Sequence, residues 1–288
     1  MSPWIQAARP LAQANLAAPL LFGQALAYAC TGHFRLEVLA CVALWGVFDQ
    51  LFIVFANDYA DRDDDVGGDS KTLFSGGSGV LPEGKITPQA LRRAAVMAYA
   101  VLGILSVFLS VWRSVWILAA WVAAGVLLWA YSFPPLRRSY RGGGEWLQAL
   151  GVGGVLPLLG FAAQAGGLSS FPWAVLAATL MLGFAGNVST ALPDYAADRR
   201  ARKRTWAVRF GVPRAAWGAL GLTVSAIYLA IAFHPFGPNG MLALAVLPLL
   251  PALRKTPRGR SSVVRFVFLQ GAASQSLLLL WAFVTVRG

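Results

Sequence analysis

The chain has 288 residues, of which 57% are apolar and only 12% are charged. Soluble globular chains carry about 25% charged residues, so this composition, with a mean hydropathy of +0.61, excludes an ordinary soluble protein. The formal net charge of +12 is also compatible with nucleic-acid binding. The positions of the charges must therefore decide between a membrane protein and a nucleic-acid-binding protein.

Nine apolar stretches are bounded by glycine, proline or charge clusters and approach the length of about 20 residues that a transmembrane helix needs. We therefore predict an all-α integral membrane protein in which residues 1–288 form one domain. The eighth stretch is the least typical because it is short and contains Pro248 and Pro251. The nine predicted transmembrane helices are residues 10–29, 36–57, 88–110, 114–132, 146–164, 171–193, 213–233, 239–253 and 264–286.

Basic residues concentrate on one side of this topology. If the N-terminus is cytoplasmic, 21 of the 24 Lys and Arg residues fall in cytoplasmic segments, and only Arg35, Arg113 and Arg287 lie on the opposite side. Lys and Arg are enriched in cytoplasmic loops, so we predict a multi-pass protein of the cell inner (cytoplasmic) membrane, with its N-terminus and active-site loops in the cytoplasm. Nucleic acid is excluded as a partner, because its recognition needs a basic surface on a soluble domain.

A first acidic cluster follows the second predicted span, where residues 57–65 read NDYADRDDD. If the helix continues through this segment, Asn57, Asp58, Asp61 and Asp65 fall within about 100° of its circumference. One face of the helix then presents about one carboxylate per turn. The alternative is that the segment is a solvated loop beside the membrane.

A second acidic cluster lies just beyond the sixth predicted span, where Asp194 and Asp198 are again one helical turn apart. Like charges near a bilayer are costly, so the two clusters predict a bound counter-ion. Oxygen ligands without His or Cys favour Mg²⁺ or Ca²⁺ over zinc, and Mg²⁺ in particular commonly shares its coordination with substrate phosphates. Basic side chains that follow these regions can neutralise a diphosphate. They are Arg137, Arg138, Lys203 and Arg204.

These motifs resemble those of the UbiA superfamily of intramembrane prenyltransferases. Its motif NDxxDxxxD matches residues 57–65, its motif DxxxD matches residues 194–198, and Arg9-Pro10 and the YxxPP segment at 131–135 also resemble family features. The resemblance covers nearly the whole chain and implies nine helices around a central chamber. It implies that the Mg²⁺ contacts are Asn57, Asp61, Asp194 and Asp198.

The resemblance also implies roles for neighbouring side chains. The family lysine after YxxPP corresponds to either Arg137 or Arg138, and the sequence leaves that choice open. We assign diphosphate neutralisation to the four basic residues Arg137, Arg138, Lys203 and Arg204. We assign substrate binding to Asp58, Asp65, Tyr131 and Tyr195.

The expected reaction is Mg²⁺-dependent transfer of a prenyl group from an isoprenyl diphosphate to an aromatic acceptor, in contact with membrane lipids. The segments YRGGGEW at 140–146 and PDYAADRRARKRT at 193–205 look most like 1,4-dihydroxy-2-naphthoate prenyltransferases of menaquinone synthesis. Other acceptors that remain open are 4-hydroxybenzoate and homogentisate. A terpene cyclase of the same superfamily and, outside enzymes, an ion transporter are the remaining alternatives.

Two further features carry predictions. Asp49 lies two helical turns before Asn57 inside a predicted span, and an intramembrane carboxylate is a functional candidate, so we predict that it orients the acceptor or accepts its ring proton. A hydrogen bond to a neighbouring helix is the alternative role. The glycine-rich segment 67–84 is long for a connection, and we predict that it caps the diphosphate, with a flexible linker as the alternative.

Overall fold

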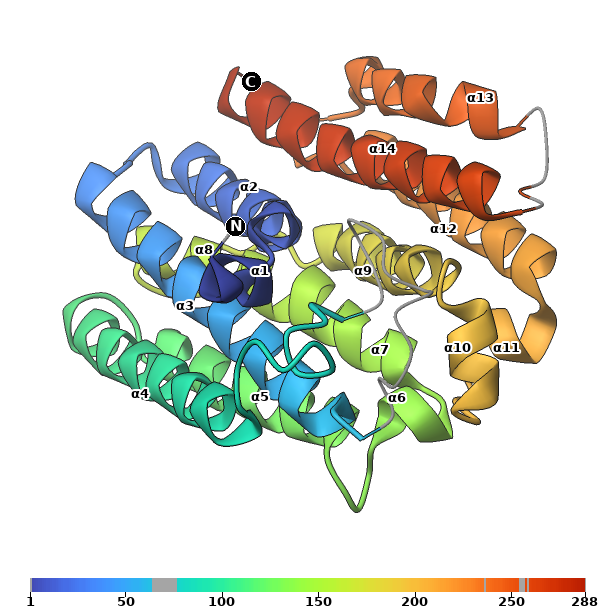
Figure 1. Cartoon of the computed structure of the whole chain (residues 1–288). Helices are drawn as coiled ribbons and strands as arrows, with labels where there is room; N and C mark the ends of the chain where they lie inside the picture. The colour runs from blue at the N-terminus through green and yellow to red at the C-terminus, as the bar shows by residue number, and fades with distance from the viewer. Residues whose placement is uncertain (1, 64–76, 236, 254–256, 258, 288) are drawn as a thin grey trace.

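The computed structural model describes residues 2–63, 77–235, 237–253, 257 and 259–287. Within these ranges the chain folds entirely into helices, turns and loops, without any strand, so the predicted all-α class is confirmed. Figure 1 shows long helices inclined in a common direction, with the short helices α6, α10 and α11 at the end of the bundle where α3 ends.

The helical segments follow one another with short connections, apart from the segment between α3 and α4. In chain order they are α1 (Pro3–Ala8), η1 (Pro10–Gln13), α2 (Ala14–Thr31), α3 (Leu36–Asp61), α4 (Pro88–Trp112), α5 (Trp116–Ser132), α6 (Arg138–Arg141), α7 (Gly144–Gln148), η3 (Ala149–Val155), α8 (Leu156–Ala165), α9 (Val175–Ala191), α10 (Tyr195–Arg200), α11 (Trp206–Phe210), α12 (Val212–Ala232), η4 (Gly240–Leu249), α13 (Leu250–Leu253) and α14 (Arg260–Arg287).

Five helical stretches of the described chain are long and apolar enough to cross a membrane: α3, α4, the continuous stretch Gly144–Ala165, α12 and α14. Shorter apolar helices occupy three further predicted spans, namely α5, α9 and Gly240–Ala252. The first predicted span coincides with η1 and α2. A multi-pass membrane protein is therefore confirmed, whereas the count of nine membrane crossings stays a prediction.

Small residues allow the helices to approach closely, as is common between helices in membranes. A Cβ atom at Gly23 of α2 would collide with the carbonyl oxygen of Pro157, and one at Gly160 of α8 would collide with that of Leu20. The two glycines therefore let α2 and α8 pack backbone against backbone. This contact fixes one wall of the bundle interior.

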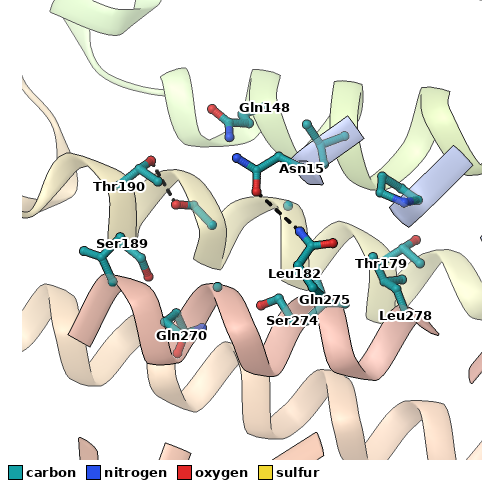
Figure 2. Close-up of a pocket in the computed structure, with 16 residues that line it drawn as sticks. Asn15, Gln148, Thr179, Leu182, Ser189, Thr190, Gln270, Ser274, Gln275 and Leu278 are labelled. Atoms are coloured by element: carbon teal, nitrogen blue, oxygen red, sulfur yellow. Dashed lines mark hydrogen bonds between the residues drawn. The ribbon is translucent and has the colours of Figure 1, made fainter. Parts of the chain in front are cut away.

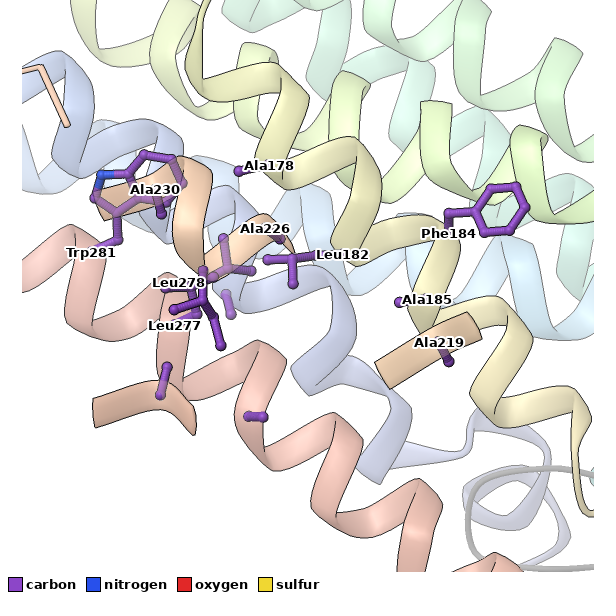
Figure 3. Close-up of a cluster of buried hydrophobic side chains, with 14 of the residues drawn as sticks. Ala178, Leu182, Phe184, Ala185, Ala219, Ala226, Ala230, Leu277, Leu278 and Trp281 are labelled. Atoms are coloured by element: carbon purple, nitrogen blue, oxygen red, sulfur yellow. The ribbon is translucent and has the colours of Figure 1, made fainter. Parts of the chain in front are cut away.

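The largest buried apolar cluster joins α2, α9, α12 and α14. Figure 3 shows Leu277, Leu278 and Trp281 of α14 in this cluster, with Ala226 and Ala230 on α12. Trp281 is completely buried, and its ring centroid lies 4.7 Å from that of Phe22. The C-terminal helix is thus held against the N-terminal part of the chain.

A π-helical segment, η3, separates α7 from α8, and three of its seven residues are glycine. Single π-helical turns inside α-helices often occur at functional sites. A Cβ atom at Gly153 would collide with the carbonyl oxygen of Thr179, so this segment lies directly against α9. The opposite side of the segment, including Gly151 and Val155, lines the central cavity described below.

Candidate functional site

The helix α3 extends into the first acidic motif and ends at Asp61, so it carries Asn57, Asp58 and Asp61 as predicted. Arg62 and Asp63 form a turn instead of continuing the helix. Asp58 and Asp61 are 4% and 7% exposed, so neither is a solvated surface residue. Asp65, the last member of the motif, lies outside the described residues. The second motif begins α10, whose first turn carries the buried Asp198.

The two acidic motifs meet at the ammonium group of Lys203. Its Nζ atom lies 3.3 Å from Oδ2 of Asp61 and 3.8 Å from Oδ1 of Asp198. The backbone N–H of Lys203 donates to the carbonyl oxygen of Asp198 at 2.8 Å, which fixes the turn after α10. One carboxylate from each motif therefore shares one cation, and the structure brings these three predicted residues together.

Arg137 and Tyr140 complete this cluster. A guanidinium nitrogen of Arg137 lies 4.0 Å from Oδ1 of Asp61, and its central carbon lies 3.6 Å from the ring centroid of Tyr140. The ammonium group of Lys203 lies 4.6 Å from the same centroid. An aromatic ring attracts cations at such distances, so Tyr140 helps to hold both cations beside the acidic pair. We call Asp61, Arg137, Tyr140, Asp198 and Lys203 the charged cluster.

Burial and charge shift the protonation of the charged cluster in opposite ways. Burial raises the pKa of Asp198 to about 6, although Lys203 and the hydroxyl of Thr205 favour its charged form. Burial alone would lower the pKa of Lys203, but Asp61 and Asp198 outweigh it and raise that pKa. Lys203 therefore stays protonated and acts as the counter-ion of the two carboxylates.

The first two residues of the acidic motif have separate partners. The side-chain oxygen of Asn57 accepts a hydrogen bond from the Ser132 hydroxyl at 3.0 Å. The carboxylate of Asp58 pairs with Arg9 and accepts hydrogen bonds from the hydroxyl and the backbone N–H of Ser78. Ser78 belongs to the predicted cap at 67–84, of which residues 67–76 lie outside the described part. The described end of this segment is thus attached to the motif.

The remaining predicted site residues lie outside the charged cluster, and their surroundings differ. Arg138 and Arg204 are exposed, while Tyr195 packs partly buried against the apolar cluster of α9, α12 and α14. Asp194 immediately precedes α10. The hydroxyl of Tyr131 accepts a hydrogen bond of 3.5 Å from Asn187. Of these predicted residues, Tyr131 also faces the interior of the bundle.

A cavity of about 250 Å³ lies between α2, α3, α5 and η3. Most of its lining is apolar, which suits a hydrocarbon chain. Its polar lining includes Asn57 and Tyr131 beside the motif and Asp49 deeper in the bundle. Asp49 is 3% exposed, and its Oδ1 atom has no hydrogen-bond donor among the described residues. We call this space the central cavity.

The donor atoms of the site are suited to Mg²⁺. Carboxylate and amide oxygens are the ligands that Mg²⁺ prefers, and Oδ1 of Asp61 is buried without a hydrogen-bond donor in the described part of the chain. Within that part, three or more His, Cys, Asp or Glu side chains do not come close enough to form a complete metal site. A bound ion would therefore use water or substrate oxygens in addition to protein ligands.

Several residues of the site were not predicted from the sequence as site residues. Arg9 belonged to a noted motif, but nothing in the sequence pairs it with Asp58. Tyr140 stands between two arginines, a pattern that does not reveal stacking. Glu145 is 3% exposed and accepts the backbone N–H of Trp206 at 2.8 Å, which ties α7 to α11. In the sequence, the only sign of a structural role for Glu145 was that it stands alone among glycines and apolar residues.

Comparison with known families gives one match, which covers most of the chain. The model of the UbiA prenyltransferase family matches residues 16–270. The comparison with curated proteins gives no match.

Solved structures with similar folds include two UbiA homologs and a synthase. A UbiA homolog from Archaeoglobus fulgidus bound to DMAPP and Mg²⁺ is 19% identical, with a TM-score of 0.70 over 99% of both chains. The apo structure of a UbiA homolog from Aeropyrum pernix K1 is 16% identical, with a TM-score of 0.68 over 92% of this chain and 97% of that chain. A digeranylgeranylglyceryl phosphate synthase is 14% identical, with a TM-score of 0.66 over 99% and 98%.

Proposed function

The chain belongs to the UbiA prenyltransferase family, and on this premise we propose that it transfers a prenyl group from an isoprenyl diphosphate to an aromatic acceptor with the help of Mg²⁺. The observation that carries the proposal is the charged cluster, in which both acidic motifs and two cations converge. It lies one helical turn from Asn57, which lines the central cavity. A diphosphate site thus adjoins a space for a hydrocarbon chain.

The acidic and the basic residues would have separate roles at the diphosphate. Asp61 and Asp198 would hold Mg²⁺. Asn57, Asp194 and the other carboxylates of the first motif are further candidate ligands. When bound, Mg²⁺ would neutralise the leaving diphosphate as a Lewis acid. Lys203 and Arg137 would place positive charge on the same phosphate oxygens as negative charge develops on them. Lys203 now pairs with Asp61 and Asp198. When Lys203 pairs with the phosphate instead, both carboxylates would become free to bind the metal.

The central cavity would protect the reactive allylic group. Its apolar lining excludes water, which would otherwise capture the carbocation. Tyr131 also lines this cavity, and an aromatic ring there can stabilise positive charge. Asp49 would orient the acceptor or receive the proton that leaves its ring, because it lines the same cavity and its Oδ1 atom has no hydrogen-bond donor in the described chain. Where the prenyl group attaches to the ring carbon that bears a carboxylate, carbon dioxide would leave from that carbon instead of the proton.

We propose 1,4-dihydroxy-2-naphthoate as the acceptor, in menaquinone synthesis, on the basis of residues 140–146 and 193–205. The positions of basic residues support an inner-membrane location with the charged cluster on the cytoplasmic side. The predicted cap at 67–84 would close over the diphosphate, and the attachment of Ser78 to Asp58 supports this role.

The proposal is tested with purified protein, a prenyl diphosphate and a panel of 1,4-dihydroxy-2-naphthoate, 4-hydroxybenzoate and homogentisate. We expect diphosphate release that requires Mg²⁺ and stops with a chelator. Asp61→Asn or Asp198→Asn should lower the rate by about 100-fold or more, because even outer contacts of a metal contribute 10- to 100-fold. Asp63→Asn is the matched control, because this carboxylate is 78% exposed.

The alternatives give different results in the same assay. A product that forms without an acceptor and contains only the atoms of the prenyl group would indicate a terpene cyclase. Movement of Mg²⁺ across vesicles without diphosphate release would indicate a transporter. Absence of turnover with every aromatic acceptor would refute the proposed reaction.

A further inference from the structure

A second, smaller cavity of about 70 Å³ lies between α2, α9 and α14. Figure 2 shows Gln270, Ser274 and Gln275 of α14 on one side of this space, and Ser189 and Thr190 of α9 on another. We call it the polar pocket. Polar side chains are costly inside a membrane bundle unless they find partners, so this concentration of amides and hydroxyls requires an explanation.

The polar pocket contains hydrogen-bond acceptors that lack donors. The side-chain oxygens of Gln270, Ser274 and Gln275 are all buried and receive no hydrogen bond within the described part of the chain. Gln270 is only 1% exposed, and its amide nitrogen is already engaged by Thr223 and by the carbonyl oxygen of Ala219. These bonds direct the Gln270 amide toward α12, and its oxygen has no donor in the described part of the chain. A buried acceptor of this kind favours a ligand that donates hydrogen bonds.

The polar pocket adjoins the central cavity. Four residues line both spaces: Asn15, Gln148, Val152 and Thr190. The amide of Gln275 donates to Asn15 at 3.3 Å, and Gln148 accepts from Asn187 at 2.5 Å. The shared wall is therefore made largely of side chains that can form hydrogen bonds to a molecule lying across it.

The size and charge of the polar pocket restrict what can enter it. An apolar cavity of about 150 Å³ is needed to hold a benzene ring, so the pocket admits a substituent while the ring stays in the central cavity. All sixteen lining residues are uncharged, so neither a carboxylate nor a diphosphate would find a cation there. A hydrocarbon chain would leave all three oxygens without a donor. An uncharged O–H group fits the size and the lack of charge, and its one proton can be donated to one of them.

We propose that the polar pocket is a subsite for a hydroxyl group of the aromatic acceptor, with the Ser274 oxygen accepting its hydrogen bond. This inference rests on the proposed prenyl transfer and adds the orientation of the acceptor. The hydroxyl-bearing edge of the ring points toward α14, and any carboxyl group stays in the central cavity. The subsite selects phenols over their ethers.

The test compares the variants Ser274→Ala and Ser274→Cys with the wild-type protein. Each removes the hydroxyl oxygen of Ser274 at little change of volume, and neither alters the hydrogen bonds of Gln270 to α12. We expect the KM for a hydroxylated acceptor to rise at least about 5-fold, as the loss of one buried hydrogen bond implies, while the KM for the prenyl diphosphate stays unchanged. The wild type should also prefer the phenol to its methyl ether, and both variants should reduce this preference.

Ser110→Ala is the matched control. The hydroxyl of Ser110 is likewise buried without a partner in the described chain, but it lies on α4 and lines neither cavity. Its removal should leave all kinetic constants unchanged. An active wild type whose variants keep the same acceptor KM and the same preference would overturn the subsite alone and indicate a pocket that holds water. A wild type without transfer to any phenol would refute the proposed function and the subsite together.

Discussion

Replacement of Lys203 by methionine tests the electrostatic balance of the charged cluster. The side chain of Lys203 is 16% exposed, and those of its two carboxylate partners are 10% exposed. Unit charges 3.3 Å apart attract each other by about 5 kcal/mol at an effective dielectric constant of 20. Removal of one partner from a buried pair costs about 3–5 kcal/mol. We expect Lys203→Met to destabilise the metal-free protein by about this amount.

Mg²⁺ should reverse this effect. With the ammonium group gone, Asp198 loses the cation at 3.8 Å and Asp61 keeps only Arg137 at 4.0 Å, so the variant should bind Mg²⁺ more tightly than the wild type when diphosphate is absent. Turnover should nevertheless fall, because Lys203 is also needed to neutralise the leaving group. Thermal unfolding of the detergent-solubilised protein, measured across a Mg²⁺ titration, gives both stability and affinity. The gain in unfolding temperature with Mg²⁺ should be larger for the variant.

Two controls accompany this measurement. Lys203→Arg keeps the charge and should preserve most of the metal-free stability, although its fork-shaped head does not reproduce the geometry of an ammonium group. Lys85→Met breaks an exposed pair with Glu83, which should cost no more than about 1 kcal/mol. If Lys203→Met unfolds at the wild-type temperature and responds equally to Mg²⁺, the counter-ion role assigned to Lys203 is wrong.

Further variants probe the supports of the site. Tyr140→Leu should raise the KM for prenyl diphosphate about 3- to 30-fold through lost cation–π attraction, whereas Tyr140→Phe should keep the wild-type value; an equal effect of both would point to the hydroxyl instead. Gly160→Ala should lower the free energy of unfolding by about 1–3 kcal/mol through overpacking, while Gly221→Ala, which meets no atom within 4 Å, should not, as urea unfolding can show. Glu145→Ala should cost about 1–3 kcal/mol by leaving a backbone N–H unsatisfied, and Glu145→Gln less; a neutral alanine variant in thermal unfolding would contradict this.

The sequence was sufficient for the features that depend on local spacing. Apolar length predicted the helices, and the one-turn spacing of Asn57 and Asp61 predicted that α3 continues into the first motif, which the structure confirms as far as Asp61. The two motifs also identified the family. Hydropathy could not reveal that the eighth predicted span begins as the 3₁₀ segment η4, although Pro248 was a sign of irregular structure.

The sequence could not predict which charged residues pair with each other across the fold. Asp58 and Asp61 are similar side chains on one helix, yet Asp58 pairs with Arg9 and Asp61 with Lys203. Spacing along the helix places both near one face but cannot specify which distant cations meet them. The same limit applies to Tyr140, whose contact with two cations depends on how α6 folds against the turn after α10.

The π-helical segment η3 determines how the interior of the bundle responds to a change in chain length. Such a segment accommodates one residue more than an α-helix of the same rise, whereas in regular helix one residue corresponds to a rotation of about 100° around the axis. A deletion of a single residue within Ala149–Val155 could therefore be absorbed by a return to regular helix, with the orientation of α8 kept. The same deletion between Leu156 and Gly160 would rotate the rest of α8, so Gly160 would no longer face Leu20 and a bulkier side chain would meet α2 in its place. Alignments of this region should therefore be judged by residue count as much as by residue identity.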